Sequence, residues 1–338
     1  GNVAVGRNAL AVNTTGAGNV AVGRNALDAN TTADNNIAIG LNASTANTTG
    51  AANVSVGAYA LNTNTTGSNN IAMGYNALGS AQGALNTALG TSTLVSTTGN
   101  DNTAVGYKAL TANTTGVGNI GVGCSALVAT TTGARNIAVG YQALQANTTG
   151  DHNVAIGYQA LYTPNVGNTV AIGYKALYAN SDTGYNNTAV GYLSLTANTT
   201  GDANTAVGRE TLEASTTGQN NTAIGYQALT SNTTGQMSVA VGVYALKDNV
   251  DGHTHTAIGY AALENVNTSY YNIGVGYYAG FGITSGSKNV AIGNESMAHA
   301  TCTGDENVAI GYDALKSVTT GGNNIALGYR AGTTNSPA

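Results

Sequence analysis

The densest group of residues able to do chemistry is formed by Asp248, Asp251, His253 and His255. In an extended segment, His253 and His255 would point to the same side, as two ligands of a zinc ion do. The sequence period around them is unbroken, however, so no special loop has been inserted to build a site. We therefore interpret this cluster as a decorated turn and predict no metal site.

Other familiar catalytic arrangements are weak in this sequence. The Gly-x-Gly strings at 121–123 and 274–276 lack the strand–loop–helix setting of a nucleotide site. No Ser-His-Asp or Cys-His arrangement stands out, and the 15 acidic residues are scattered along the chain. We predict no catalytic residues, no cofactor and no enzyme activity.

Asn-Thr-Thr triplets are the remaining chemical motif, because each is formally an acceptor for N-glycosylation. Turns favour Asn and Thr in any case, so the triplets are equally well explained as turn residues. The candidate attachment sites are Asn13, Asn30, Asn113 and Asn147, and the same triplet occurs at Asn47, Asn64, Asn198 and Asn232.

These motifs sit within one repeat that fills the whole chain. A glycine that ends an Ala-Val/Ile-Gly triplet, or a close variant of it, recurs twenty times between Gly6 and Gly328, which gives 322 residues over nineteen intervals, or 16.9 each. A typical copy reads Asn-x-Ala-Val-Gly-Tyr-x-Ala-Leu-x-x-Asn-Thr-Thr-Gly-x-x, as in residues 136–152. A fixed period of this kind predicts a stacked array. The abundance of Gly, Asn and Thr argues against helices. We predict an all-β parallel β-solenoid of about twenty coils, forming a single domain over residues 1–338.

Two short extended segments per coil are expected. The first carries an aliphatic residue such as Val22 or Ile39 next to a small one such as Ala21 or Ala138. Because alternate strand residues face opposite sides, we expect the aliphatic to face the core and the small residue to point outward. The second segment carries Ala-Leu, as at Leu144, and supplies another core residue. Glycine and Thr-Thr-Gly provide the turns.

Two further columns of residues follow from the stacking. Seventeen of twenty coils begin with Asn, the exceptions being Thr169, Ser238 and His255. Stacked coils would place these amides about 4.8 Å apart and allow amide ladders. The structural ladder is predicted to include Asn19, Asn36, Asn53, Asn136, Asn153, Asn221 and Asn307. Eleven coils carry Tyr after the glycine, which forms either an aromatic stack over a turn or a sugar- or surface-binding stripe.

Composition excludes several functions. A net charge of −5 gives no footprint for nucleic acid. No stretch approaches the ~18 apolar residues of a membrane helix, so we expect no membrane insertion within this segment. Cys124 and Cys302 lie 178 residues apart, too far along a straight solenoid for a disulfide. We interpret the chain as a segment of a longer fibre protein.

The Asn-x-Ala-Ile/Val-Gly repeats resemble the heads of trimeric autotransporter adhesins. The longer run Asn-Thr-Ala-Val-Gly-Tyr-x-Ala-Leu-x-x-Asn-Thr-Thr-Gly is still more similar to repeats of phage-tail-fibre-like proteins that end in an endosialidase-type chaperone domain. The match covers essentially the whole chain, although the adhesin-head repeat is usually shorter and no stalk, anchor or chaperone domain is present here. The resemblance implies a left-handed, trimeric β-roll in an adhesive or structural fibre and supplies no catalytic residues.

We therefore expect a non-enzymatic, extracellular fibre or adhesin shaft, in a cell-surface appendage or virion. A homotrimer that meets an unknown surface or glycan receptor fits this role. The alternatives are an ice- or glycan-binding solenoid surface, or a single solenoid stacked end to end into a filament. An enzyme acting on polysaccharide would need a carboxylate cluster that the sequence does not show.

Overall fold

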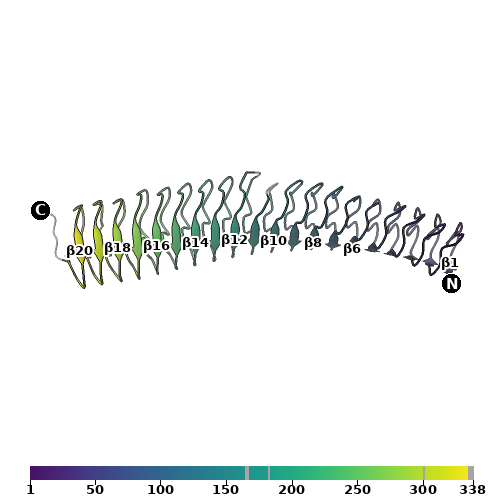
Figure 1. The fold of residues 1–338 in the computed structure, drawn as a ribbon, viewed down its shortest axis with the longest axis horizontal. Coiled ribbons are helices and arrows are strands. Elements are labelled where there is room, and N and C mark those ends of the chain that lie inside the picture. The colour runs from purple at the N-terminus through teal and green to yellow at the C-terminus, as the bar shows by residue number, and fades with distance from the viewer. Residues whose placement is uncertain (164–166, 182, 300, 334–338) are drawn as a thin grey trace. The chain divides into compact units, whose positions relative to one another are not determined.

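The computed structural model describes residues 1–163, 167–181, 183–299 and 301–333. It confirms the predicted all-β parallel solenoid. Twenty strands of three residues each recur about every 17 residues, one in each coil, and the described residues contain no helix. Figure 1 shows the strands with the turns of each coil looping away from them.

The chain forms two compact units, residues 1–168 and 169–338. The first contains β1 (Val3–Val5), β2 (Val20–Val22), β3 (Ile37–Ile39), β4 (Val54–Val56), β5 (Ile71–Met73), β6 (Thr87–Leu89), β7 (Thr103–Val105), β8 (Ile120–Val122), β9 (Ile137–Val139) and β10 (Val154–Ile156). The second contains β11 (Val170–Ile172), β12 (Thr188–Val190), β13 (Thr205–Val207), β14 (Thr222–Ile224), β15 (Val239–Val241), β16 (Thr256–Ile258), β17 (Ile273–Val275), β18 (Val290–Ile292), β19 (Val308–Ile310) and β20 (Ile325–Leu327).

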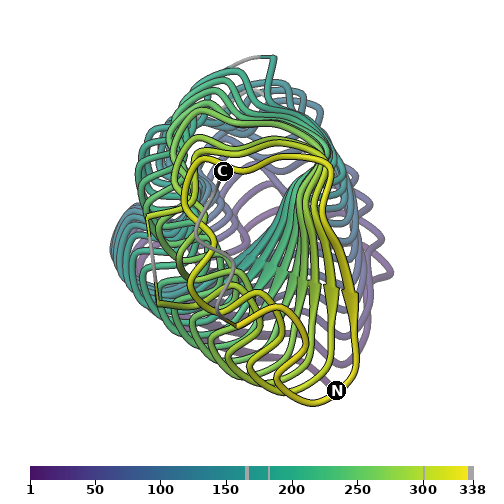
Figure 2. The same cartoon turned by 90° about the vertical axis from the view of Figure 1, so that its left-hand side faces the viewer.

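Within each unit, successive strands pair in parallel without slipping. Ala138 of β9 lies opposite Ala155 of β10, and Ala189 of β12 lies opposite Ala206 of β13. Figure 2 shows the green and yellow strands of the second unit lying together on one side of their coils. Equivalent side chains of neighbouring coils therefore stand in columns at the strand spacing of about 4.8 Å.

The direction of the strand side chains is the reverse of the sequence prediction. In β9 the middle residue Ala138 is fully buried, whereas Ile137 and Val139 on either side remain partly exposed. In β3 both flanking residues, Ile37 and Ile39, are exposed, at 37% and 40%. The small residue thus faces the core and the aliphatics face outward. This inward position holds only small residues, and at Gly274 a methyl group would already lie 2.7 Å from Cγ of Leu263.

The expected second strand is also wrong, although its leucine is a core residue as predicted. Leu144 is fully buried, but its φ is +50°, in the left-handed region, and the segment around it is a turn. Its backbone N–H still reaches the next coil, donating to the carbonyl oxygen of Ala160 at 3.1 Å. Left-handed backbone is unfavourable for a residue with a side chain, so burial of the leucine and this hydrogen bond must hold the turn.

Candidate functional site

The asparagines at the coil starts form a buried column that joins one coil to the next. The backbone N–H of Asn36 donates to Oδ1 of Asn19 at 2.9 Å, and Nδ2 of Asn36 donates to the carbonyl oxygen of Gly50 at 3.0 Å. The same bond, from a backbone N–H to Oδ1 of the preceding asparagine, recurs along the column. All seven predicted members are at most 1% exposed: Asn19, Asn36, Asn53, Asn136, Asn153, Asn221 and Asn307.

The ladder therefore runs mainly from side chain to backbone rather than from amide to amide. Direct amide contacts occur at some steps only, such as Nδ2 of Asn136 to Oδ1 of Asn119 at 3.1 Å. Each side chain supplies partners to groups that would otherwise be buried and unpaired. We assign these asparagines a structural role.

A second buried column contains the asparagines of the Asn-Thr-Thr triplets. Nδ2 of Asn30 donates to Oδ1 of Asn13 in the preceding coil at 2.9 Å. Nδ2 of Asn113 donates to the carbonyl oxygen of Gly116 at 3.0 Å, and that of Asn147 to Gly150 at 3.1 Å. A glycan would be attached at this Nδ2 atom. In the folded chain, Asn30, Asn113 and Asn147 are fully buried, so a glycan there would have to replace these bonds.

His253 and His255, from the Asp/His cluster noted in the sequence, each accept a hydrogen bond from a neighbouring coil. Nδ1 of His253 accepts the backbone N–H of Gln236 at 2.9 Å, and its ring stacks on Tyr270. His255 is 1% exposed and its Nδ1 accepts the backbone N–H of Asn272 at 3.2 Å. Burial lowers the pKa of His255 to about 4. Among the described residues, no group of three His, Cys, Asp or Glu side chains is placed to hold a metal ion.

Another surface feature, present in each unit, is the outer face of its strands, which we call the outer strand face. It consists of the first and third residues of every strand, all of them aliphatic residues or threonine. In the first unit, eight of these side chains are more than a third exposed: Val3, Val5, Ile37, Ile39, Ile71, Met73, Ile120 and Ile156. No charged residue stands on the face, so in each unit it is an uncharged and largely apolar strip that repeats with the coils.

The tyrosines that follow the strand glycines form a second exposed column. Tyr141 stacks on Tyr158 with ring centroids 5.4 Å apart, and Tyr174 stacks on Tyr192 at 5.2 Å. These four rings remain 41–46% exposed. The column covers the end of the strand and still offers ring surface to a partner.

One place in the second unit departs from this regularity. An open pocket of about 430 Å³ lies between the turns that follow β17 and β18, lined by Tyr277, Tyr278, Phe281, Glu295, Ala298 and His299. A smaller adjoining pocket of about 140 Å³ shares Phe281, Ala298 and His299, and adds Asn265, Gly282, Thr284 and Thr301. The sequence prediction missed these residues. The available signal was the only phenylalanine of the chain, because Asn294 is one of nine coil positions where the repeat lacks its tyrosine.

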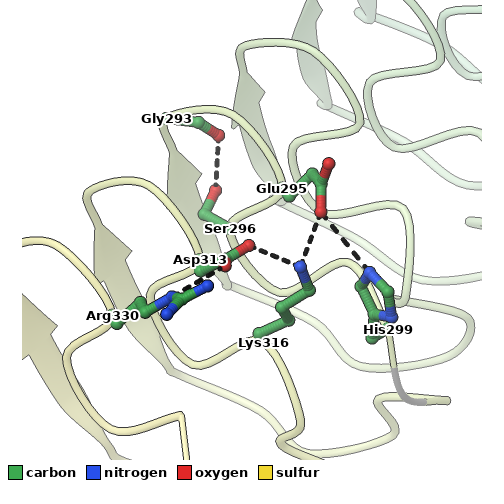
Figure 3. A network of polar contacts seen from close by, with 7 residues as sticks. All are labelled: Gly293, Glu295, Ser296, His299, Asp313, Lys316 and Arg330. Carbon is green, nitrogen blue, oxygen red and sulfur yellow. Dashed lines mark hydrogen bonds and ion pairs between the residues drawn. The ribbon is translucent and has the colours of Figure 1, made fainter.

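A chain of ion pairs holds one wall of the larger pocket (Figure 3). Nζ of Lys316 lies 2.6 Å from Oε2 of Glu295 and 2.6 Å from Oδ1 of Asp313, while Nε2 of His299 lies 3.4 Å from Oε2 of Glu295. Nε of Arg330 is 3.3 Å from Oδ2 of Asp313. The hydrogen bond from Lys316 lowers the pKa of both Glu295 and Asp313, so both remain carboxylates at neutral pH.

Both cysteines are free thiols, with Cys302 buried and Cys124 partly buried. Within the described ranges, no helix is long and apolar enough to cross a membrane. No protein-family profile, curated protein or solved structure matches this chain.

Proposed function

We propose that this chain is a structural segment of an extracellular fibre or adhesin shaft, carried by a cell-surface appendage or a virion, and that it performs no catalysis. The observation that carries this proposal is the outer strand face. Its uncharged side chains repeat in register from coil to coil, as in β12 and β13, where Thr188 lies opposite Thr205. Large contiguous apolar patches on soluble proteins mark interaction surfaces. The resemblance of the repeats to fibre proteins supports the same role.

We propose further that three copies assemble around a common axis through their outer strand faces. The small strand residues that were expected to point outward cannot form this interface, because those alanines are buried. The exposed aliphatic columns take its place, since packing them against one another removes apolar surface from water. Threefold closure is a common oligomer symmetry and is the one that the sequence resemblance implies.

Lysine substitutions test whether this face carries assembly. Ile37→Lys combined with Ile71→Lys places two charges on the outer strand face of the first unit, where both side chains are already exposed. Burying unpaired charges in an interface is strongly unfavourable, so sedimentation should show the double variant at a lower mass than the wild type. The matched control places lysines at Thr49 and Thr66, exposed positions of the Thr-Thr turns. Loss of assembly in the control, or its retention in the face variant, would contradict the proposal.

A second candidate is ice binding by the same face. Thr188, Thr205 and Thr222 stand in register on β12, β13 and β14, each with an aliphatic residue at the other outward position. A regular, flat array of hydroxyl and methyl groups is suited to an ordered water surface. Measurement of thermal hysteresis distinguishes the two roles. Thermal hysteresis in the wild type that is lost in Thr205→Lys would favour ice binding, and no thermal hysteresis in the wild type would favour the fibre role.

A further inference from the structure

The larger pocket in the second unit lies beside one of the coils that lack a tyrosine after the strand glycine. Tyr277 stacks on Tyr260 on one side, with ring centroids 5.5 Å apart. The next coil carries Asn294 instead of a tyrosine, so the column does not continue onto Tyr277 from that coil. Tyr277 is 48% exposed. An aromatic ring that lines an open pocket offers a flat, electron-rich surface to weakly positive C–H groups.

The pocket is built from residues that depart from the repeat. The typical coil of residues 136–152 carries Gln142, Leu144 and Gln145 after its strand glycine. The equivalent positions of the pocket coil hold Tyr278, Gly280 and Phe281. Tyr278 packs edge-on against Tyr277 at 4.5 Å and against Phe281 at 4.9 Å. These contacts fix three rings as one wall. The regular coils thus serve as a scaffold for a local group of aromatic side chains that the repeat itself does not require.

The turn after β18 supplies hydrogen-bonding groups whose charge is already compensated. Glu295 is paired with Lys316 and adjoins His299, as Figure 3 shows. A carboxylate held in this way accepts hydrogen bonds from hydroxyl groups without requiring a cation from the ligand. In the adjoining pocket, Asn265, Thr284 and Thr301 add amide and hydroxyl groups. An aromatic wall facing a few fixed polar groups is the usual composition of a small-molecule site.

We propose that these two adjoining pockets form a binding site for a neutral oligosaccharide. The apolar face of one pyranose ring packs on Tyr277, Tyr278 and Phe281, and its hydroxyl groups hydrogen-bond to Glu295 and His299. A second sugar unit occupies the smaller pocket. The proposal rests on the surface role proposed above and gives it a ligand class.

Saturation-transfer NMR on the full chain tests the site, with maltose, cellobiose, lactose and N,N′-diacetylchitobiose as probes and choline as a cationic comparison. We expect transfer to at least one of the four disaccharides. Tyr277→Ala and His299→Ala should each weaken that binding by about fivefold to tenfold, the size of one lost ring or polar contact. The control Tyr158→Ala removes a ring from the first unit and should leave binding unchanged. Circular dichroism and melting temperature verify that each variant is folded.

Three results would overturn the site: no transfer to any of the four disaccharides, preferential binding of choline, or an equal loss in Tyr158→Ala, which would place binding along the whole tyrosine column. The fibre role is judged separately by particle mass. Sugar binding by a particle of single-chain mass would reject assembly and keep the site. A trimer that binds none of the probes would reject the site and keep assembly.

Discussion

At the scale of single residues, the coil depends on side chains chosen for small size or for hydrogen bonding. Gly90 follows β6 and has a φ of +135°, and a methyl group added there would lie 2.6 Å from the carbonyl oxygen of Gly106 in the next coil. Asn36 and Asn47 both donate to the carbonyl oxygen of Gly50. Because neighbouring coils are in direct contact, an added atom that clashes in one coil also displaces the next.

Gly90→Ala should be among the most damaging single substitutions. The methyl group would meet main-chain atoms, and the backbone angle is nearly restricted to glycine, which costs of the order of 1–3 kcal/mol before the clash is counted. The control is Gly118→Asn. Gly118 has a φ of +67°, and a Cβ atom added there would meet only Cγ of Arg135, at 3.7 Å. Asn35, at the same position of an earlier coil, has a φ of +59°. Denaturant unfolding should show a large loss for the first variant and little change for the second. Similar losses in both would contradict the account.

A gap in the Asn-Thr-Thr column predicts a stabilising substitution. Oδ1 of Asn113 is buried without a hydrogen-bond partner, because the next coil has Thr130 where asparagine would donate to it. Thr130→Asn should supply that donor and raise stability by about 1 kcal/mol. Thr132→Asn, at an exposed turn position two residues away, should have little effect. The melting temperatures of the two variants test this prediction. A lower melting temperature for Thr130→Asn would show that an asparagine at this position does not fit the column.

His255 predicts a pH dependence of stability. Burial lowers its pKa in the folded chain to about 4 from the ordinary 6.5, with nearby His253 adding to the shift and the carbonyl oxygen of Ser269 opposing it. The unfolded chain therefore takes up this proton first. Stability should fall as pH drops from about 6.5 to 4, by roughly 3 kcal/mol, and change no further through this group at lower pH.

The matched variant is His255→Asn, which restores the residue usual at this position of the coil. Other titrating groups are common to both proteins, so the difference between their melting temperatures at pH 7 and pH 4.5 isolates His255. The wild type should lose more than the variant over this range. Equal losses would mean that His255 does not titrate as its burial requires.

At the scale of the coil, substitutions can test which strand side chains face the core and which face outward. Ala155 is fully buried, whereas its neighbour Ile156 is 38% exposed. Ala155→Val should overpack the narrow core and cost roughly 1–3 kcal/mol. Ile156→Val removes one methyl group and should cost less, at most about 0.5–1.5 kcal/mol even where assembly covers the outer strand face. The measurement is urea unfolding of the two variants in the same oligomeric state. A larger loss for Ile156→Val than for Ala155→Val would support the orientation expected from the sequence.

The sequence predicted the coil length, the parallel stacking and the buried leucines, because each follows from a strict period of 17 residues. It did not predict which strand face is buried. Large aliphatic residues usually fill cores, but the column of Leu144 and its equivalents, with the two asparagine columns, leaves room only for small residues such as alanine, serine and glycine. The left-handed turn around Leu144 was also missed, since a φ of +50° has no sequence signal in a residue other than glycine or asparagine.

The pocket near Phe281 could be found only in part from the sequence. The single phenylalanine marks a departure from the repeat, whereas Asn294 alone does not, since nine of the twenty coils lack the tyrosine. The meaning of the phenylalanine depends on which side chains of two coils meet. Glu295 and Lys316 are 21 residues apart, and their contact at 2.6 Å follows from the stacking of neighbouring coils.

At the scale of the whole molecule, the account makes this chain one copy in an assembly held by its outer strand faces. Eight apolar side chains of that face in the first unit alone are more than a third exposed. The rival arrangement, end-to-end stacking of single solenoids, would leave the face in water and give an open-ended series of masses. Symmetric association through the face gives one closed particle.

Native mass measurement of the unmodified chain at neutral pH tests this claim most directly. One chain has a mass of 33.5 kDa. The account predicts a single species at three times that mass. A species at the mass of one chain, or a ladder of masses without an upper limit, would contradict it.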